Sequence, residues 1–229
     1  REAETAPDVG CIVLTGAGGA FCAGGDVKGM AEGGRGGNAG PSSLDARIHG
    51  QRLSQRNTAG RIYEMPKPVI AAIPGAAAGA GLSLALACDL RIASEKAVLV
   101  TAFARVGFSG DYGGTWFLTQ LVGPAKAREL YYLSERLDAK AAEGLGLLNR
   151  VVPEASLEEQ SLDLARRLAH GPTVAYRYMK ENINRAISGE FGDCLDLEAT
   201  HHVHTGLTED HREAARAFVE KREPTFKGR

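Results

Sequence analysis

PKPVIAAIPGAAAGAGLSLALACDLRIAS, residues 66–94, joins two apolar runs through a stretch of small residues. Its first run, residues 68–73, is rich in β-branched side chains and predicts a buried strand. Residues 75–89 predict a turn that leads into a buried helix. Residues 90–94 and 97–101 predict two more strands. A strand, a helix and further strands in this order indicate an α/β fold.

The flanking segments continue this alternation. Residues 11–16, CIVLTG, predict a strand that a glycine ends, and residues 44–65 predict a helix that Pro66 and Pro68 stop. From residue 113 onward helical patterns dominate, so the sequence predicts a helical region after the α/β part. Between these elements, residues 29–43 are rich in glycine and serine, and we expect a flexible loop that is mobile or ordered by a ligand.

Composition and charge are those of a globular protein. The 229 residues are 44% hydrophobic and 24% charged, with a net charge of -1. Such a small net charge gives no bulk reason to expect nucleic acid or an anionic membrane as a partner. We find no apolar run of bilayer length and no signal peptide, and we expect a cytoplasmic protein. The chain begins with Arg1, which leaves its native start open.

Cysteine and histidine patterns favour structural roles. None of the four cysteines forms a C-x-x-C pair, so we expect reduced thiols; they are Cys11, Cys22, Cys88 and Cys194. HHVH, residues 201–204, offers His201 and His204 as metal ligands on one helix face. No carboxylate completes a familiar ligand spacing, so we interpret this stretch as a solvated surface and predict no metal.

Two cofactor or nucleophile motifs are incomplete. Residues 14–21, LTGAGGAF, place Phe21 where a dinucleotide-binding loop has its last glycine. Residues 107–111, GFSGD, place Asp111 where a serine nucleophile elbow has its final glycine. The sequence therefore argues against a dinucleotide-binding loop and a serine hydrolase.

Two glycine-rich turns each precede a predicted helix. They are FCAGGDVKGM, residues 21–30, and PGAAAGAGLSL, residues 74–84. Small residues let a ligand approach the backbone, and N–H groups at a helix start point towards it. Two such turns facing one pocket would form an oxyanion hole, although each turn alone favours a helix packed tightly on a sheet. Asp26, just before VKGM, is interpreted as a helix N-cap.

A single carboxylate, Asp111, lies among glycines and aromatics in VGFSGDYGGTWF, residues 106–117. Aspartate is a common turn residue, so a tight loop is one interpretation. A general base held in a mostly apolar pocket is the other.

Taken together, these segments resemble the crotonase, or enoyl-CoA hydratase/isomerase, superfamily. The resemblance runs nearly from end to end, and it also rests on residues 107–153 and on TEDHREAARAFVEKREPTFKG, residues 208–228. It implies an α/β spiral of ββα turns in an acyl-CoA-binding core, residues 1–153. Residues 154–229 would form a C-terminal α-helical region that builds homotrimers or hexamers. A further strand pair that family members have before residue 11 is not seen in this chain.

The resemblance also implies roles for individual residues. Gly25 and Ala80 would donate their backbone N–H groups to the thioester oxygen. The substrate's coenzyme A would be bound by Ala23, Gly25, Asp26, Val27, Lys28, Ala80 and Phe103, and in a neighbouring subunit by Phe218 and Lys221. No separate cofactor is implied.

The chain departs from the family pattern at two positions. Typical hydratases carry water-activating glutamates at positions that correspond to Ser83 and Phe103 here. Their loss argues against water addition by two glutamates. In motif pattern, the chain is most similar to 1,2-epoxyphenylacetyl-CoA isomerase-like members, which implies phenylacetate catabolism as a setting.

Asp111 is then expected to act as a catalytic proton shuttle. We expect Phe103, Phe108 and Trp116 to desolvate its carboxylate and raise its basicity. Ser83 and Tyr112 are interpreted as nearby polar groups. The alternatives are a hydratase with atypical acid/base residues, a hydrolase with Asp111 as nucleophile, and an inactive CoA-binding subunit.

Overall fold

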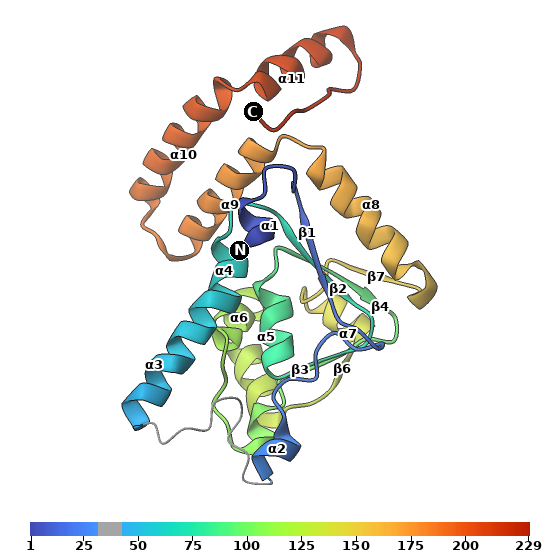
Figure 1. The fold of residues 1–229 in the computed structure, drawn as a ribbon, viewed down its shortest axis with the longest axis vertical. Helices are drawn as coiled ribbons and strands as arrows, with labels where there is room; N and C mark the ends of the chain where they lie inside the picture. The colour runs from blue at the N-terminus through green and yellow to red at the C-terminus, as the bar shows by residue number, and fades with distance from the viewer. Residues whose placement is uncertain (32–42) are drawn as a thin grey trace. The chain divides into compact units, whose positions relative to one another are not determined.

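The computed structural model describes residues 1–31 and 43–229 and shows a mixed α/β fold (Figure 1). One sheet has the strand order β1-β2-β4-β7 and a second has the order β3-β5-β6. The strands are β1 (Ile12–Thr15), β2 (Val69–Ile73), β3 (Ala76–Ala78), β4 (Leu90–Ser94), β5 (Val98–Val100), β6 (Leu137–Asp138) and β7 (Arg150–Val152).

Helices follow most strands and make up the C-terminal part. They are α1 (Glu2–Thr5), α2 (Val27–Ala31), α3 (Leu44–Gln55), α4 (Arg61–Glu64), α5 (Ala80–Ala87), α6 (Gly114–Leu133), α7 (Ala139–Gly144), α8 (Leu157–Ala169), α9 (Thr173–Ser188), α10 (Phe191–Gly206) and α11 (Glu209–Glu220). Short 3₁₀ segments lie at η2 (Phe103–Val106) and η3 (Glu154–Ser156), and a π-helical turn, η1 (Arg56–Gly60), joins α3 to α4.

The chain divides into two compact units. The first comprises residues 1–13, 64–70 and 159–229, and the second residues 14–63 and 71–158. The division predicted from the sequence, at residue 153, remains a prediction.

Most predicted elements are confirmed, and one differs. The strands expected at 11–16, 68–73, 90–94 and 97–101 are β1, β2, β4 and β5. The turn expected before the buried helix instead contains strand β3, which pairs in parallel with β5. Of the predicted loop 29–43, residues 32–42 lie outside the described residues.

Helix α5 is the centre of the second unit. Six of its eight residues are buried, because its sequence AGLSLALA is apolar or small on every side. It packs against α6 and β3 (Figure 1). These contacts fix the first residues of α5, and with them the backbone N–H groups at the start of the helix.

Close backbone contact joins the first turn of α5 to the segment after β1. The N–H groups of Phe21 and Cys22 donate to the Ala76 carbonyl at 3.0 and 3.1 Å, and Ala78 donates to the Cys22 carbonyl at 2.9 Å. A Cβ at Gly81 would lie 2.3 Å from that Cys22 carbonyl oxygen. Only glycine permits this approach, and the approach brings the two glycine-rich turns together.

We expect Gly81→Ala to lower the free energy of unfolding by about 1–3 kcal/mol, because the added methyl group meets backbone rather than a flexible side chain. Gly50→Ala is the matched control within a helix, since no described atom lies within 4 Å of a Cβ there. It should raise the free energy of unfolding by about 0.5–1 kcal/mol. Urea denaturation of both variants checks this, and equal effects would contradict the packing argument.

Candidate functional site

Two backbone amides meet where the glycine-rich turns lie side by side. Gly24 has a φ of +89°, and a Cβ there would lie 2.8 Å from the Ala78 carbonyl oxygen and 3.7 Å from the Ala80 nitrogen. Ala80 is the first residue of α5. Within the described residues, the Gly25 and Ala80 amides donate no hydrogen bond. An oxyanion hole is built from N–H groups that the fold leaves free in this way.

The predicted CoA-binding stretch 23–28 leads from this place into α2. Asp26 caps that helix, because its Oδ1 accepts a hydrogen bond from Gly29 N–H at 3.0 Å, which confirms the N-cap prediction. Ala23, Val27 and Lys28 are exposed. Their contact with coenzyme A stays a prediction.

Asp111 lies in a turn with unusual backbone angles. Gly110, Tyr112 and Gly113 all have positive φ, at 119°, 47° and 74°. The turn ends where Gly114, the first residue of α6, donates its N–H to the Asp111 carbonyl at 3.0 Å. Positive φ in a bulky residue such as tyrosine costs energy and persists only where the surroundings enforce it.

Helix α3 supplies that enforcement. The side-chain oxygen of Gln55 accepts a hydrogen bond from the Tyr112 N–H at 2.9 Å, and the Tyr112 hydroxyl lies 3.0 Å from the Ser54 hydroxyl. Both sides of Tyr112 are therefore held. Tyr112, expected from the sequence to be a polar group near Asp111, therefore anchors the turn that carries Asp111.

The Asp111 carboxylate is poorly solvated. Its Oδ1 is buried and has no hydrogen-bond partner among residues 1–31 and 43–229. Burial raises the pKa of Asp111 above its ordinary value, because it disfavours the charged form. A carboxylate in this state is a stronger base than one in water.

The aromatic residues expected around Asp111 have different surroundings. Phe103 is buried, Phe108 is 56% exposed, and Trp116 packs edge-on against Tyr63 with ring centroids 5.2 Å apart. Their shielding of Asp111 stays a prediction. The residue that sequence reasoning missed is Tyr131, whose pKa is raised by burial and by the Asp111 charge. It lies twenty positions further along the chain and beyond a kink in α6 at Gly123.

Ser83 and Phe103, at the two glutamate positions of typical hydratases, line one narrow gap. Ser83 is buried and donates from its hydroxyl to the Gly79 carbonyl at 3.3 Å. Phe103 stacks on Tyr131, with ring centroids 5.8 Å apart and planes 7° apart. As bounded by the described residues, the gap does not admit a water molecule.

Phe218 and Lys221 belong to the other compact unit. Phe218 lies on α11 with 85% of its surface exposed, and Lys221 follows that helix with a φ of +54°. Their predicted role, contact with the coenzyme A of a neighbouring subunit, stays a prediction.

The interpretation of residues 201–204 as a solvated surface is wrong for His201, which is buried between α9 and α10. Its Nδ1 lies 2.6 Å from the Asn182 side-chain oxygen, and its ring centroid lies 4.3 Å from that of Tyr178. His202 and His204 are exposed. His201 is buried because it lies on the side of α10 that packs against α9.

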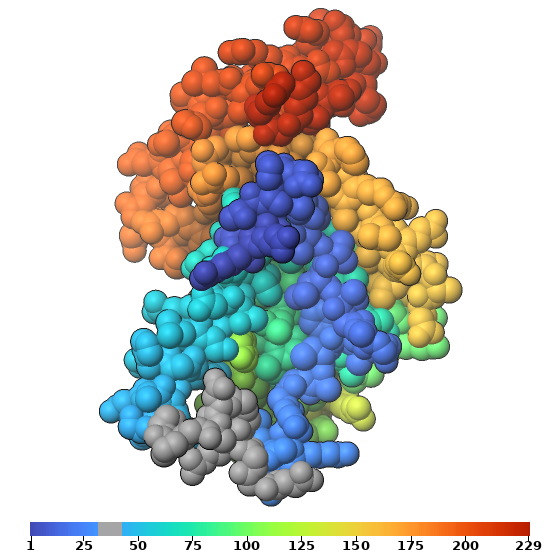
Figure 2. Space-filling view, in the orientation of Figure 1, coloured from blue at the N-terminus to red at the C-terminus, as the bar shows by residue number. Residues whose placement is uncertain are grey.

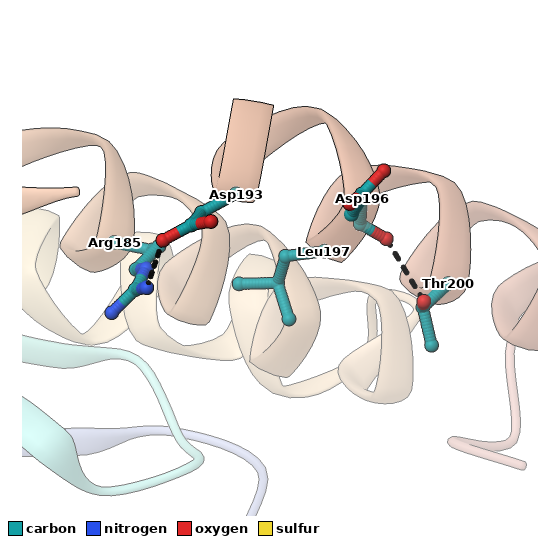
Figure 3. Close-up of a pocket in the computed structure, with 5 residues that line it drawn as sticks. All are labelled: Arg185, Asp193, Asp196, Leu197 and Thr200. Atoms are coloured by element: carbon teal, nitrogen blue, oxygen red, sulfur yellow. Dashed lines mark hydrogen bonds and ion pairs between the residues drawn. The ribbon is translucent and has the colours of Figure 1, made fainter. Parts of the chain in front are cut away.

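A shallow surface groove also lies along α9 and α10 (Figure 3). Its lining includes an ion pair in which the Arg185 Nη2 lies 2.8 Å from the Asp193 Oδ2, and the hydroxyl of Thr200 donates to the Asp196 carbonyl. The charges of Arg185 and Asp193 therefore neutralise each other within the groove.

None of the helices in the described part is both long and apolar enough to cross a membrane.

Comparison with known proteins gives one consistent family. The enoyl-CoA hydratase/isomerase family matches residues 1–229. A probable enoyl-CoA hydratase from Rhodobacter capsulatus is 39% identical, over 95% of this chain and 81% of the relative. The 1,2-epoxyphenylacetyl-CoA isomerase of Escherichia coli is 36% identical, over 100% of this chain and 85% of that enzyme.

Comparison with solved structures points to the same family. An enoyl-CoA hydratase from Polaromonas sp. JS666 superposes with a TM-score of 0.89 at 36% identity, covering 98% of this chain and 85% of its own. An enoyl-CoA hydratase from Bacillus anthracis gives a TM-score of 0.88 at 34% identity, covering 100% and 85%. With this agreement in sequence and fold, the chain belongs to the crotonase family of enoyl-CoA hydratases and isomerases.

Proposed function

We propose that this acyl-CoA enzyme is an isomerase that moves a double bond or rearranges an activated ring, with Asp111 as the proton shuttle. The observation that carries the proposal is the Asp111 carboxylate, which is half-buried and has one oxygen without a partner among the residues that the structure describes. The free Gly25 and Ala80 amides support the same chemistry, because they suit the oxygen of a thioester enolate.

For a 3-enoyl thioester, the steps balance without added water. The Asp111 carboxylate takes a proton from C2, and the C–H electron pair moves into the thioester carbonyl to form a dienolate. The Gly25 and Ala80 N–H groups stabilise the negative oxygen. The Asp111 carboxylic acid then returns the proton to C4, the carbonyl re-forms, and the product is the 2-enoyl thioester.

Ser83 and Phe103 support isomerisation over hydration. Neither side chain can act as the general base that hydration by two glutamates requires at neutral pH. A single buried carboxylate suffices for a proton that leaves one carbon and returns to another.

Hydration is the second candidate, and the Rhodobacter capsulatus relative, a probable hydratase, favours it. In that case Asp111 would activate the water alone. The E. coli relative, a 1,2-epoxyphenylacetyl-CoA isomerase, favours a ring substrate and phenylacetate catabolism.

We further propose that the protein is a cytoplasmic homotrimer or hexamer that needs no cofactor besides the coenzyme A of its substrate. Large apolar side chains exposed on α9, α10 and α11 support self-association; they include Met179, Ile183, Phe191, Leu195, Val203 and Phe218. Much of α10 and α11 lies on the surface, drawn in orange and red in Figure 2. Contact with a second copy would remove this apolar surface from water.

Incubation with a panel of 2-enoyl- and 3-enoyl-CoA thioesters, followed by mass spectrometry, tests the proposed function. Conversion at unchanged mass is the expected result. Gain of one water would mean hydration, and release of free coenzyme A would mean hydrolysis. Substrate binding without any conversion across the panel would favour an inactive CoA-binding subunit.

We expect Asp111→Asn to lower kcat for isomerisation roughly 10²–10⁴-fold, because an amide cannot accept the proton. The thermal midpoint should stay or rise, since the variant removes a poorly solvated charge. Asp138→Asn is the matched control, because Asp138 caps α7 with an exposed carboxylate. Steady-state kinetics and thermal melts check both variants, and unchanged turnover in Asp111→Asn would exclude the shuttle role.

Ala80→Pro should lower kcat roughly 10²–10³-fold by removing one oxyanion donor. Proline is well tolerated at the first position of a helix, which is where Ala80 lies, so α5 should survive the change. Ala80→Ser keeps the N–H group and serves as the control. Circular dichroism and initial rates separate the two, and equal rates would contradict the role of this amide.

The pH profile should report a base with a raised pKa. Activity needs the ionised Asp111, so kcat/KM should fall as the pH drops through the pKa of that carboxyl. Because burial raises this pKa, the fall should begin at a higher pH than an ordinary aspartate would give. Rates at constant ionic strength check this, and an acid limb at the position of a solvated aspartate would contradict it.

A further inference from the structure

The Tyr131 hydroxyl lies over the turn that carries Asp111. Its oxygen would be 2.7 Å from a Cβ at Gly114 and 3.5 Å from a Cβ at Gly110, the residues that enclose Asp111 on either side. No hydrogen-bond partner of this hydroxyl is found in the described part of the chain. An unused donor therefore lies beside the turn that holds an unpartnered buried acceptor, the Asp111 Oδ1.

The ring of Tyr131 is held in place. It stacks on the buried Phe103, and together with Ser83 and Gly114 it lines the narrow gap between α5 and α6. The Ser83 hydroxyl also points at Gly114, within 2.2 Å of a Cβ built there, but it already donates to the Gly79 carbonyl. Of the two hydroxyls that face Gly114, that of Tyr131 is thus the one without a partner in the described part of the chain.

Buried carboxylate oxygens in native proteins nearly always have a donor, because leaving one unpaired costs free energy. A tyrosine hydroxyl is a suitable donor as long as it stays protonated. The pKa of Tyr131 is raised by burial and by the Asp111 charge, so the proton stays on Tyr131 at neutral pH. The electrostatic coupling also agrees with the closeness that the turn geometry indicates.

We propose that Tyr131 is a positioning residue for Asp111: in the substrate complex its hydroxyl donates a hydrogen bond to Oδ1, which fixes the carboxylate and leaves the other oxygen to carry the proton. This inference rests on the proposed function of Asp111 and adds the group that orients it. The hydrogen bond also favours the ionised carboxylate, and so offsets part of the cost of burial.

Other groups near the turn do not compete for this role. Tyr112 is held by Ser54, and α5 carries no titratable side chain. Arg105 on η2 donates to the Ser134 carbonyl at 2.6 Å, and Arg128 on α6 lines a surface cleft with Ser109 and Tyr131.

Tyr131→Phe tests the proposal, because it keeps the ring and removes only the hydroxyl. We expect kcat/KM with a 3-enoyl-CoA thioester to fall roughly 10- to 100-fold at neutral pH, with KM nearly unchanged. The acid limb of the pH profile should move to higher pH, since the carboxylate loses a donor that favours its charged form. Tyr132→Phe is the control, because Tyr132 is the next residue and 73% exposed.

A double-mutant cycle with Asp111→Asn supplies a second test. Tyr131→Phe should have little further effect in the Asp111→Asn background, since its role acts through Asp111. Additive losses would overturn the proposal, as would a Tyr131→Phe enzyme with wild-type kcat and an unmoved acid limb. If Asp111→Asn abolishes turnover while Tyr131→Phe leaves it unchanged, this inference alone fails. If Asp111→Asn itself keeps full turnover, the proposed function fails and this inference fails with it.

Discussion

The close approach of Gly81 to the Cys22 carbonyl is the contact on which the candidate site depends. A methyl group at Gly81 would lie 2.3 Å from that oxygen, so the start of α5 and the segment after β1 share a space that only glycine leaves open. Parallel pairing of residues 21–22 with β3 fixes the same arrangement from the other side. Together they bring the segment of Gly24 and Gly25 close to Ala80, and neither the Gly25 nor the Ala80 amide donates a hydrogen bond within the described residues.

The turn that carries Asp111 differs from this contact, because its backbone is strained at the place where we expect the chemistry to occur. The positive φ of Tyr112 and the burial of an Asp111 carboxylate oxygen are each unfavourable, and Ser54 and Gln55 on α3 hold Tyr112 in place. Strained backbone and shifted pKa values are common at functional sites, where a reactive group is held in place and poorly solvated. In the proposed isomerase, the amides would stabilise the negative charge and the carboxylate would transfer the proton.

Sequence patterns predicted the parts whose cause is local. The apolar run 68–73 and the position of Asp26 before a short helix were sufficient to predict β2 and an N-cap. Strand β3 was missed because three alanines carry little β preference, and its pairing with β5 is a tertiary effect. Tyr131 was missed and His201 was misjudged for a similar reason: which side of a helix is buried depends on elements distant in the sequence. The roles of Gly25, Ala80 and Asp111 came from family resemblance rather than from spacing.

The measurement that most directly tests the account follows a 3-enoyl-CoA thioester carrying deuterium at C2 through a single turnover in ordinary water. A shuttle by one poorly solvated carboxylate predicts a 2-enoyl product in which part of the deuterium has moved to C4. A product that has gained one water and carries no deuterium at C4 would contradict the account, because the site would then deliver solvent rather than return a proton.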